Sequence, residues 1–205
     1  MSRRWAYLAV GLLLSAIASA GFFPTPKILK GRIENDVYHA PGDVLSVAVP
    51  FAKGTYEYTY LRIREQFYAR SRLIVFGPAA YDESIYRVEL MQRRDGVATQ
   101  ESFQEDAPQL MLGAMQMMEQ DARAPVKETA RDQEPVNGHP TLHVQGTQQV
   151  PAGLMANRPV RVSHEFFVMK FTTLIAVVIV MRPERRPSPT PGIPAARFAS
   201  SLQVP

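Results

Sequence analysis

The chain has 205 residues, of which 46% are hydrophobic and 20% are charged, and its formal net charge is +4. This length suits one globular domain with a well-packed core, whereas two domains would each be small. Because the chain has no cysteine, disulfides, thiol catalysis and thiolate metal sites are excluded.

The first 20 residues have the three parts of a secretory signal peptide. Arg3 and Arg4 precede an apolar run over 5–17, and the small residues Ala18-Ser19-Ala20 follow it. This run is shorter than the ~20 residues that a spanning helix needs. We therefore predict cleavage after Ala20, with a retained anchor as the alternative, and a periplasmic or secreted protein formed by residues 21–205 as one α+β domain.

Removal of this segment also changes the charge of the protein. Without Arg3 and Arg4, the 23 basic residues become 21 against 19 acidic ones, and the net charge falls from +4 to +2. Nucleic-acid binding usually requires a concentrated basic surface. We expect no nucleic-acid partner.

Strand patterns dominate the first half of the mature chain. The turn residues Ala40-Pro41-Gly42-Asp43 predict a hairpin between the first two strands. Tyr86, Val88 and Leu90 share one face of the last strand. The predicted strands cover residues 36–39, 44–49, 56–68, 71–76 and 84–93.

The periodicity changes to that of an amphipathic helix between Glu105 and Ala124. Asp106 and Pro108 are residue types found at helix starts, and Pro125 is expected to end the helix. The predicted apolar stripe comprises Leu110, Met111, Ala114, Met115, Met117 and Met118.

The remainder of the chain returns to strand patterns. Asn137-Gly138 is the strongest hairpin signal in the sequence. The prolines of 183–194 predict an extended connector to a short helix over 195–203, with Phe198 and Leu202 facing inward. The predicted strands cover residues 126–134, 139–149, 160–170 and 173–181.

The uncharged stretch FTTLIAVVIVM, Phe171 to Met181, is the most apolar part of the mature chain. As a helix, its eleven residues would rise about 16 Å, roughly half of the ~30 Å hydrocarbon thickness of a bilayer. Its β-branched residues suit a strand buried on both faces. We predict the central strand of an antiparallel sheet that packs against a central helix and a short C-terminal helix, and no transmembrane span after cleavage.

Three segments, VYHAPGDVLSVAVP, VNGHPTLHVQG and ARFASSLQ, together with the order of the elements, resemble the PsbP-like α+β domains. In these domains an antiparallel sheet packs between helices. The resemblance implies a binding or assembly module, and it implies no site residues and no role in photosynthesis.

A possible ligand surface lies on the strand predicted over 56–68. Its alternate residues form a tyrosine and arginine stripe, in which aromatic rings could stack on a ligand and guanidinium groups could pair with a carboxylate or phosphate. The alternative is that the tyrosines only cover the sheet and the arginines are solvated. The stripe comprises Tyr56, Tyr58, Tyr60, Arg62 and Arg64.

No metal or cofactor site is predicted. Thioether sulfurs can bind Cu(I), but a methionine stripe at helical spacing is more often core. His139 and His143 lie about 13 Å apart along one strand, too far to share a metal, and His39 and His164 are isolated in sequence.

The common catalytic motifs are also missing from the sequence, including Gly-x-Ser-x-Gly, His-Glu-x-x-His and glycine-rich phosphate loops. We therefore interpret the protein as an exported, non-catalytic binding or assembly module for a small ligand or a cell-envelope protein. The alternative is a periplasmic hydrolase in which His39 or His164 belongs to a triad built across the sheet.

The stripe hypothesis has a direct test. Replacing Arg62 and Arg64 with Ala should leave the fold intact and abolish capture of the partner in a pull-down from envelope extract, because the guanidinium donors are lost. Unchanged capture would reject the stripe as the site.

Overall fold

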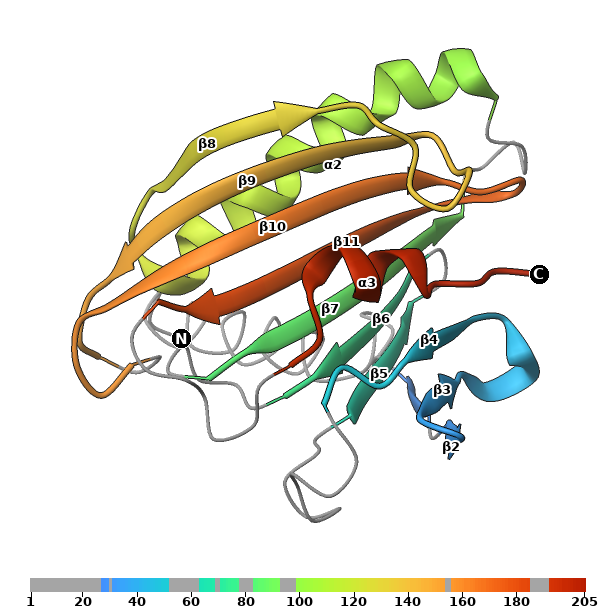
Figure 1. Cartoon of the computed structure of the whole chain (residues 1–205), viewed down its shortest axis with the longest axis horizontal. Coiled ribbons are helices and arrows are strands. Elements are labelled where there is room, and N and C mark those ends of the chain that lie inside the picture. The colour runs from blue at the N-terminus through green and yellow to red at the C-terminus, as the bar shows by residue number, and fades with distance from the viewer. Residues whose placement is uncertain are drawn as a thin grey trace, which may run out of the picture.

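The computed structural model describes residues 27–29, 31–51, 63–68, 71–77, 83–92, 99–153, 156–184 and 192–205, with the backbone alone for 27–29 and 63–68. These residues are organised around an eight-stranded antiparallel sheet with the order β1-β5-β6-β7-β11-β10-β9-β8 (Figure 1). Its strands are β1 (Lys27–Leu29), β5 (Ile63–Tyr68), β6 (Ser71–Phe76), β7 (Ile85–Gln92), β8 (Val126–Asp132), β9 (Thr141–Val150), β10 (Val160–Lys170) and β11 (Leu174–Pro183).

A smaller sheet and two helices cover the large sheet. The small sheet contains β2 (Arg32–Glu34), β3 (Val37–His39) and β4 (Ser46–Ala48), with the 3-10 turn η1 (Pro41–Asp43) between β3 and β4. The long helix α2 (Gln100–Ala122) packs against β8 to β11 on one face. The small sheet and α3 (Ala195–Ser200) lie on the other face (Figure 1). The α+β class and the predicted antiparallel sheet with its two helices are confirmed.

Strand β11 is buried on both faces, as the stretch FTTLIAVVIVM predicts. Every residue from 175 to 181 is buried. Successive side chains of a strand point to opposite faces, so Val177 and Ile179 enter the core beneath α2, whereas Val178 and Val180 enter the core beneath the small sheet and α3. Within the described ranges, no helix combines the length and the apolar character that crossing a bilayer requires.

The predicted start of the long helix is wrong. The helix begins at Gln100, and the Thr99 hydroxyl accepts a hydrogen bond from the Ser102 amide at 3.1 Å, which satisfies one of the free amides of the first turn. Pro108 lies inside the helix, where it removes one backbone donor. The end before Pro125 is confirmed, because Arg123 adopts a left-handed φ of 53° that ends the helix.

The end of the chain also differs from the prediction. The helix predicted over 195–203 ends at Ser200, and Gln203 instead pairs with Ser46 of β4 through two backbone hydrogen bonds of 2.9 Å each. Phe198 and Leu202 are buried as expected. Residues 185–191 of the predicted connector, and the predicted signal peptide, lie outside the described residues.

The predicted hairpins are present. Val136 and His139 exchange two backbone hydrogen bonds of 3.0 Å each, and Asn137 and Gly138 both have positive φ angles, 50° and 78°, as a tight two-residue turn requires. β3 and β4 pair as predicted, but they belong to the small sheet and not to the large one.

Aromatic rings join the small sheet, the large sheet and α3 into one core. Phe76 of β6 contacts Tyr38 of β3 and Phe198 of α3 edge to face, with ring centroids 5.5 and 5.8 Å apart. The hydroxyl of Tyr86 donates to the Ile193 carbonyl at 2.8 Å. Gly192 is required beside it, because a Cβ atom there would lie 1.9 Å from the Tyr86 hydroxyl.

The double-sided burial of β11 predicts the effect of a charge at its centre. Val178→Asp should unfold the protein, because an unpaired carboxylate in an apolar core costs several kcal/mol, and thermal unfolding monitored by circular dichroism would measure the loss. The exposed Thr172 precedes the same strand, so Thr172→Asp is the control and should unfold close to the wild-type temperature. A folded Val178→Asp variant would contradict the burial of β11.

Candidate functional site

The predicted tyrosine and arginine stripe falls mainly outside the described residues. Tyr56, Tyr58, Tyr60 and Arg62 are in the range 52–62, and Arg64 lies in β5, of which only the backbone is described. The expected strand over 56–68 is therefore described from Ile63 onward. The stripe remains a prediction.

An open cavity of about 400 Å³ lies on the face of the large sheet that carries the small sheet. We call it the Arg72 cavity. Its walls come from η1, the beginning of β6, the end of β7, the turn before β11 and the C-terminal segment. Its polar lining residues are Asp43, Ser71, Arg72, Gln92 and Thr173, and its apolar side chains come mainly from Val44, Leu90, Leu174 and Val204.

Arg72 is the buried charge of this cavity. It shares a strand face with Ile74 and Phe76, which are in the core, and it is itself only 7% exposed. Its Nη2 donates to the Pro41 carbonyl at 3.1 Å, so the side chain also holds η1 in place. Burial of a charged group is costly unless polar partners compensate it, and the Pro41 carbonyl is one such partner.

The C-terminal segment closes one side of the cavity. After α3 the chain pairs with β4 through Gln203, and the Ser201 hydroxyl accepts a hydrogen bond from the Ala48 amide at 3.0 Å. These contacts place Val204 in the lining of the cavity. The C-terminal segment therefore extends the small sheet beside β4 and also forms one wall of the cavity.

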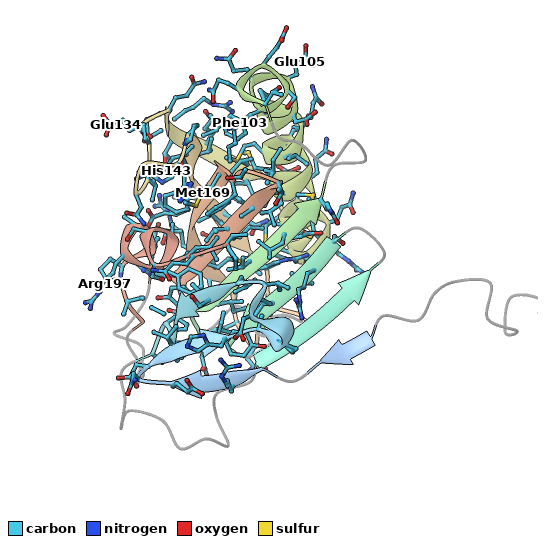
Figure 2. All side chains as sticks on the ribbon, turned by 90° about the vertical axis from the view of Figure 1, so that its right-hand side faces the viewer. Phe103, Glu105, Glu134, His143, Met169 and Arg197 are labelled. Carbon is cyan, nitrogen blue, oxygen red and sulfur yellow. The ribbon has the colours of Figure 1, made fainter. Side chains whose placement is uncertain are left out.

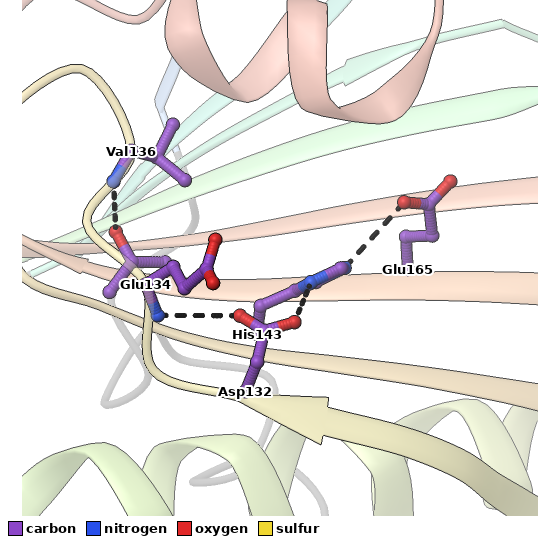
Figure 3. Close-up of polar contacts among 6 residues, drawn as sticks. Asp132, Glu134, Val136, His143 and Glu165 are labelled. Atoms are coloured by element: carbon purple, nitrogen blue, oxygen red, sulfur yellow. Dashed lines mark hydrogen bonds and ion pairs between the residues drawn. The ribbon is translucent and has the colours of Figure 1, made fainter.

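A second polar cluster lies on the same sheet face, around His143 of β9 (Figure 3). Its Nδ1 lies 2.9 Å from an Asp132 carboxylate oxygen and its Nε2 lies 3.6 Å from a Glu165 oxygen. The imidazole stacks on Phe167 with centroids 4.2 Å apart and planes at 6°. Figure 2 shows His143 near the buried Met169 of β10, whereas Glu105 and Arg197 point away from the body of the protein.

The carboxylates of Glu165 and Asp132 raise the pKa of His143. Partial burial of the ring acts in the opposite direction, since an apolar environment disfavours the imidazolium. The attraction of the two carboxylates outweighs it. Protonated His143 therefore attracts a carboxylate on each neighbouring strand and links β9 to β8 and β10.

His164 of β10 lies on the opposite face of the sheet, beneath α2, and is 1% exposed. Its Nε2 lies 3.0 Å from the Gln148 side-chain oxygen. The Gln148 amide nitrogen donates to the Met118 and Ala124 carbonyls at 3.0 and 2.7 Å, which leaves its oxygen as the acceptor for His164. Among the described residues, Nδ1 of His164 has no hydrogen-bond partner, and burial lowers the pKa of His164 to about 4.

The catalytic alternative requires a histidine between a serine and a carboxylate. The polar contact of His164 is with Gln148, and no contact within the described residues joins His39 to such a pair. The expected methionine stripe is core, since Met111 and Met118 are 1% and 3% exposed. No group of three or more histidine or acidic side chains in the described part of the chain is placed to hold a metal ion.

Sequence reasoning missed both the Arg72 cavity and the His143 cluster. One signal for Arg72 was available, because the predicted strand over 71–76 alternates so that Arg72 shares its face with Ile74 and Phe76. No comparable signal existed for the cluster. Its three side chains come from three strands, and their proximity depends on the pairings Asp132 with His143 and Gln145 with Glu165.

Comparisons with known proteins give no family for this chain. No family model matches it, and no curated protein matches it. A crystal structure of a protein from Bacteroides thetaiotaomicron VPI-5482 is similar with a TM-score of 0.39 and 9% identity, over 84% of this chain and 49% of that chain. The chain thus spans about half the length of that protein. A TM-score of this size supports no functional argument, and the PsbP-like resemblance remains a prediction.

The pKa values of His143 and His164 should differ from the ordinary value of ~6.5 in opposite directions. In an NMR titration of the ring protons, His143 should titrate above this value and His164 should remain neutral until about pH 4. Asp132→Asn should lower the pKa of His143, because one carboxylate is lost, and should leave His164 unchanged. An ordinary pKa for His164 would contradict its burial.

The same shifts give the two histidines opposite effects on stability. The contribution of His143 is present below ~6.5 and is lost as pH rises through its raised folded pKa. The contribution of neutral His164 is present above ~6.5 and is lost as pH falls toward about 4. Urea unfolding should therefore show that wild type loses about 2 kcal/mol more than His164→Gln between ~pH 6.5 and ~pH 5. Parallel pH dependences of the unfolding free energy for the two proteins would contradict the lowered pKa of His164.

Proposed function

We propose that the protein is a non-catalytic binding module that holds a small molecule in the Arg72 cavity. The observation that carries the proposal is the composition of the cavity. Apolar side chains from Leu90, Leu174 and Val204 line the cavity together with the buried Arg72 and a few polar groups, among which the Asp43 carboxylate is exposed. Small-molecule sites in proteins are typically concave and mostly apolar, with a small number of polar groups that orient the ligand.

A role in binding also agrees with the chemistry of the lining. The described residues around the cavity include the Ser71 and Thr173 hydroxyls but no histidine that would activate them. The predicted N-terminal signal peptide supports a place for the module in the cell envelope. The PsbP-like resemblance supports the same type of role.

The proposed site can be tested with a neutral fluorescent probe and a pair of adjacent threonines. Thr173 lines the cavity, so Thr173→Trp should weaken the binding of N-phenylnaphthylamine at least ~10-fold, because the indole occupies the space of the probe. Fluorescence titration of the folded variant measures the dissociation constant.

Thr172 is the matched control, since it is exposed and adjacent to Thr173 but is not part of the lining. Thr172→Trp should bind the probe with wild-type affinity. Equal affinities for the two tryptophan variants would place the probe elsewhere and reject the cavity as the site. Absence of binding to the wild-type protein would also count against the proposal.

A further inference from the structure

We propose that the protein forms a two-fold symmetric dimer through the face of β6 and β7 that lies beside α2, with a second copy of the chain as the partner. This inference goes beyond the proposed function, because the Arg72 cavity opens on the opposite face of the large sheet. It rests on an ion pair in β7, on the apolar neighbours of that pair and on the symmetry of its two charges.

The ion pair consists of Arg87 and Glu89 of β7. Arg87 is the cross-strand partner of Ile179 in β11, and directly opposite residues share a sheet face. Ile179 belongs to the core beneath α2. Glu89 follows two residues later and therefore points to the same face. Both charges thus lie on a face that continues an apolar core, in an interior strand of the sheet.

This ion pair leaves hydrogen-bonding groups without partners. The Arg87 Nη2 and Glu89 Oε2 atoms lie 3.8 Å apart, which is longer than a hydrogen bond. The Nε atom of Arg87 is buried and has no hydrogen-bond partner among the described residues. The two side chains are only 19% and 29% exposed, and charges removed from water are costly unless they are paired and hydrogen-bonded. A partner that supplies a carboxylate and a guanidinium would satisfy both side chains.

Apolar side chains lie next to the pair and are only partly covered. Val75 and Leu73 of β6 are the cross-strand partners of Arg87 and Glu89, and Met91 is the next residue of β7 on this face. These three side chains are half-buried. Within the described residues, the main contacts of α2 are with β8 to β11 (Figure 1), so its cover ends beside β7. Removing such apolar surface from water is favourable. We call these five residues the β7 surface.

A second copy of the β7 surface carries both complementary charges at the required spacing. Two sheets that pack face to face lie ~10 Å apart. If the two-fold axis lies between the sheets and crosses the strands over Val88, β7 runs antiparallel to its copy. Arg87 then lies opposite the partner subunit's Glu89, and Glu89 lies opposite the partner subunit's Arg87. The interface is isologous, and both ion pairs form at once because the two charges are two residues apart on one strand.

Charge reversals test this interface. Sedimentation velocity of the wild-type protein over a concentration series should show a reversible dimer. Arg87→Glu and Glu89→Arg each bring like charges together across the axis, so each variant alone should dimerise at least ~10-fold more weakly. Arg197 is exposed on α3, on the opposite face of the sheet. Arg197→Glu changes the net charge as Arg87→Glu does and should dimerise like the wild type.

An equimolar mixture of Arg87→Glu and Glu89→Arg separates pairing between chains from pairing within one chain. In the mixed dimer, two carboxylates of one variant face two guanidinium groups of the other. The mixture should therefore dimerise more tightly than either variant alone. Pairing within one chain cannot produce this rescue, because each variant chain carries two like charges. A mixture that dimerises as weakly as its components would overturn the proposal.

The remaining outcomes also decide. A wild-type protein that stays monomeric over the whole series, or a dimer that the charge reversals leave unchanged, would contradict an interface at the β7 surface. Circular dichroism checks that each variant is folded. Should a reversed variant fail to fold, Arg87→Gln takes its place, because it removes the pairing without adding a like charge. Dimerisation of Arg87→Gln at wild-type strength would then reject the interface.

Discussion

The burial of β11 on both faces is the constraint on which the rest of the structure depends. Its residues alternate between two apolar cores, so each face of the sheet centre needs its own cover. The amphipathic helix α2 covers one face. The other face needs the small sheet and α3 together, and α3 follows β11 in the chain. The contact of Gly192 and Ile193 with Tyr86 fixes the path by which the chain returns over that face.

Two groups of polar residues lie on the sheet face that carries the small sheet and α3. Beneath the small sheet and α3, the large sheet presents buried residues such as Ile74, Val178 and Phe167. At one margin Arg72 takes the place of a core residue and the Arg72 cavity opens. At another margin the His143 ring covers Phe167 while its nitrogens face two carboxylates. Both features therefore lie on the sheet face that carries the small sheet and α3, and the first lines a cavity of about 400 Å³.

Much of the sheet could be predicted from the sequence, because local patterns determine it. The strand over 71–76, the Asn137-Gly138 turn and the apolar run before Met181 each carry a signal within a few residues. The helix start was missed although its signal is local, since Thr99 caps the Ser102 amide and Phe103 is the first buried residue of α2. The other missed features depend on distant partners, since Gln203 leaves the helical pattern to pair with Ser46. The His143 cluster likewise requires the register of three strands, which no local pattern specifies.

Arg72 shows how a local rule can identify a site once the fold is known. The alternation of β6 assigns positions 72, 74 and 76 to the core face, and an apolar residue at position 72 would satisfy the packing alone. Replacing a buried charge by an apolar group of similar volume often leaves stability unchanged or improves it. The hydrogen bond to Pro41 gives the arginine a structural contact that ties β6 to η1. Position 72 therefore combines a place on the core face of β6 with a place in the wall of the Arg72 cavity.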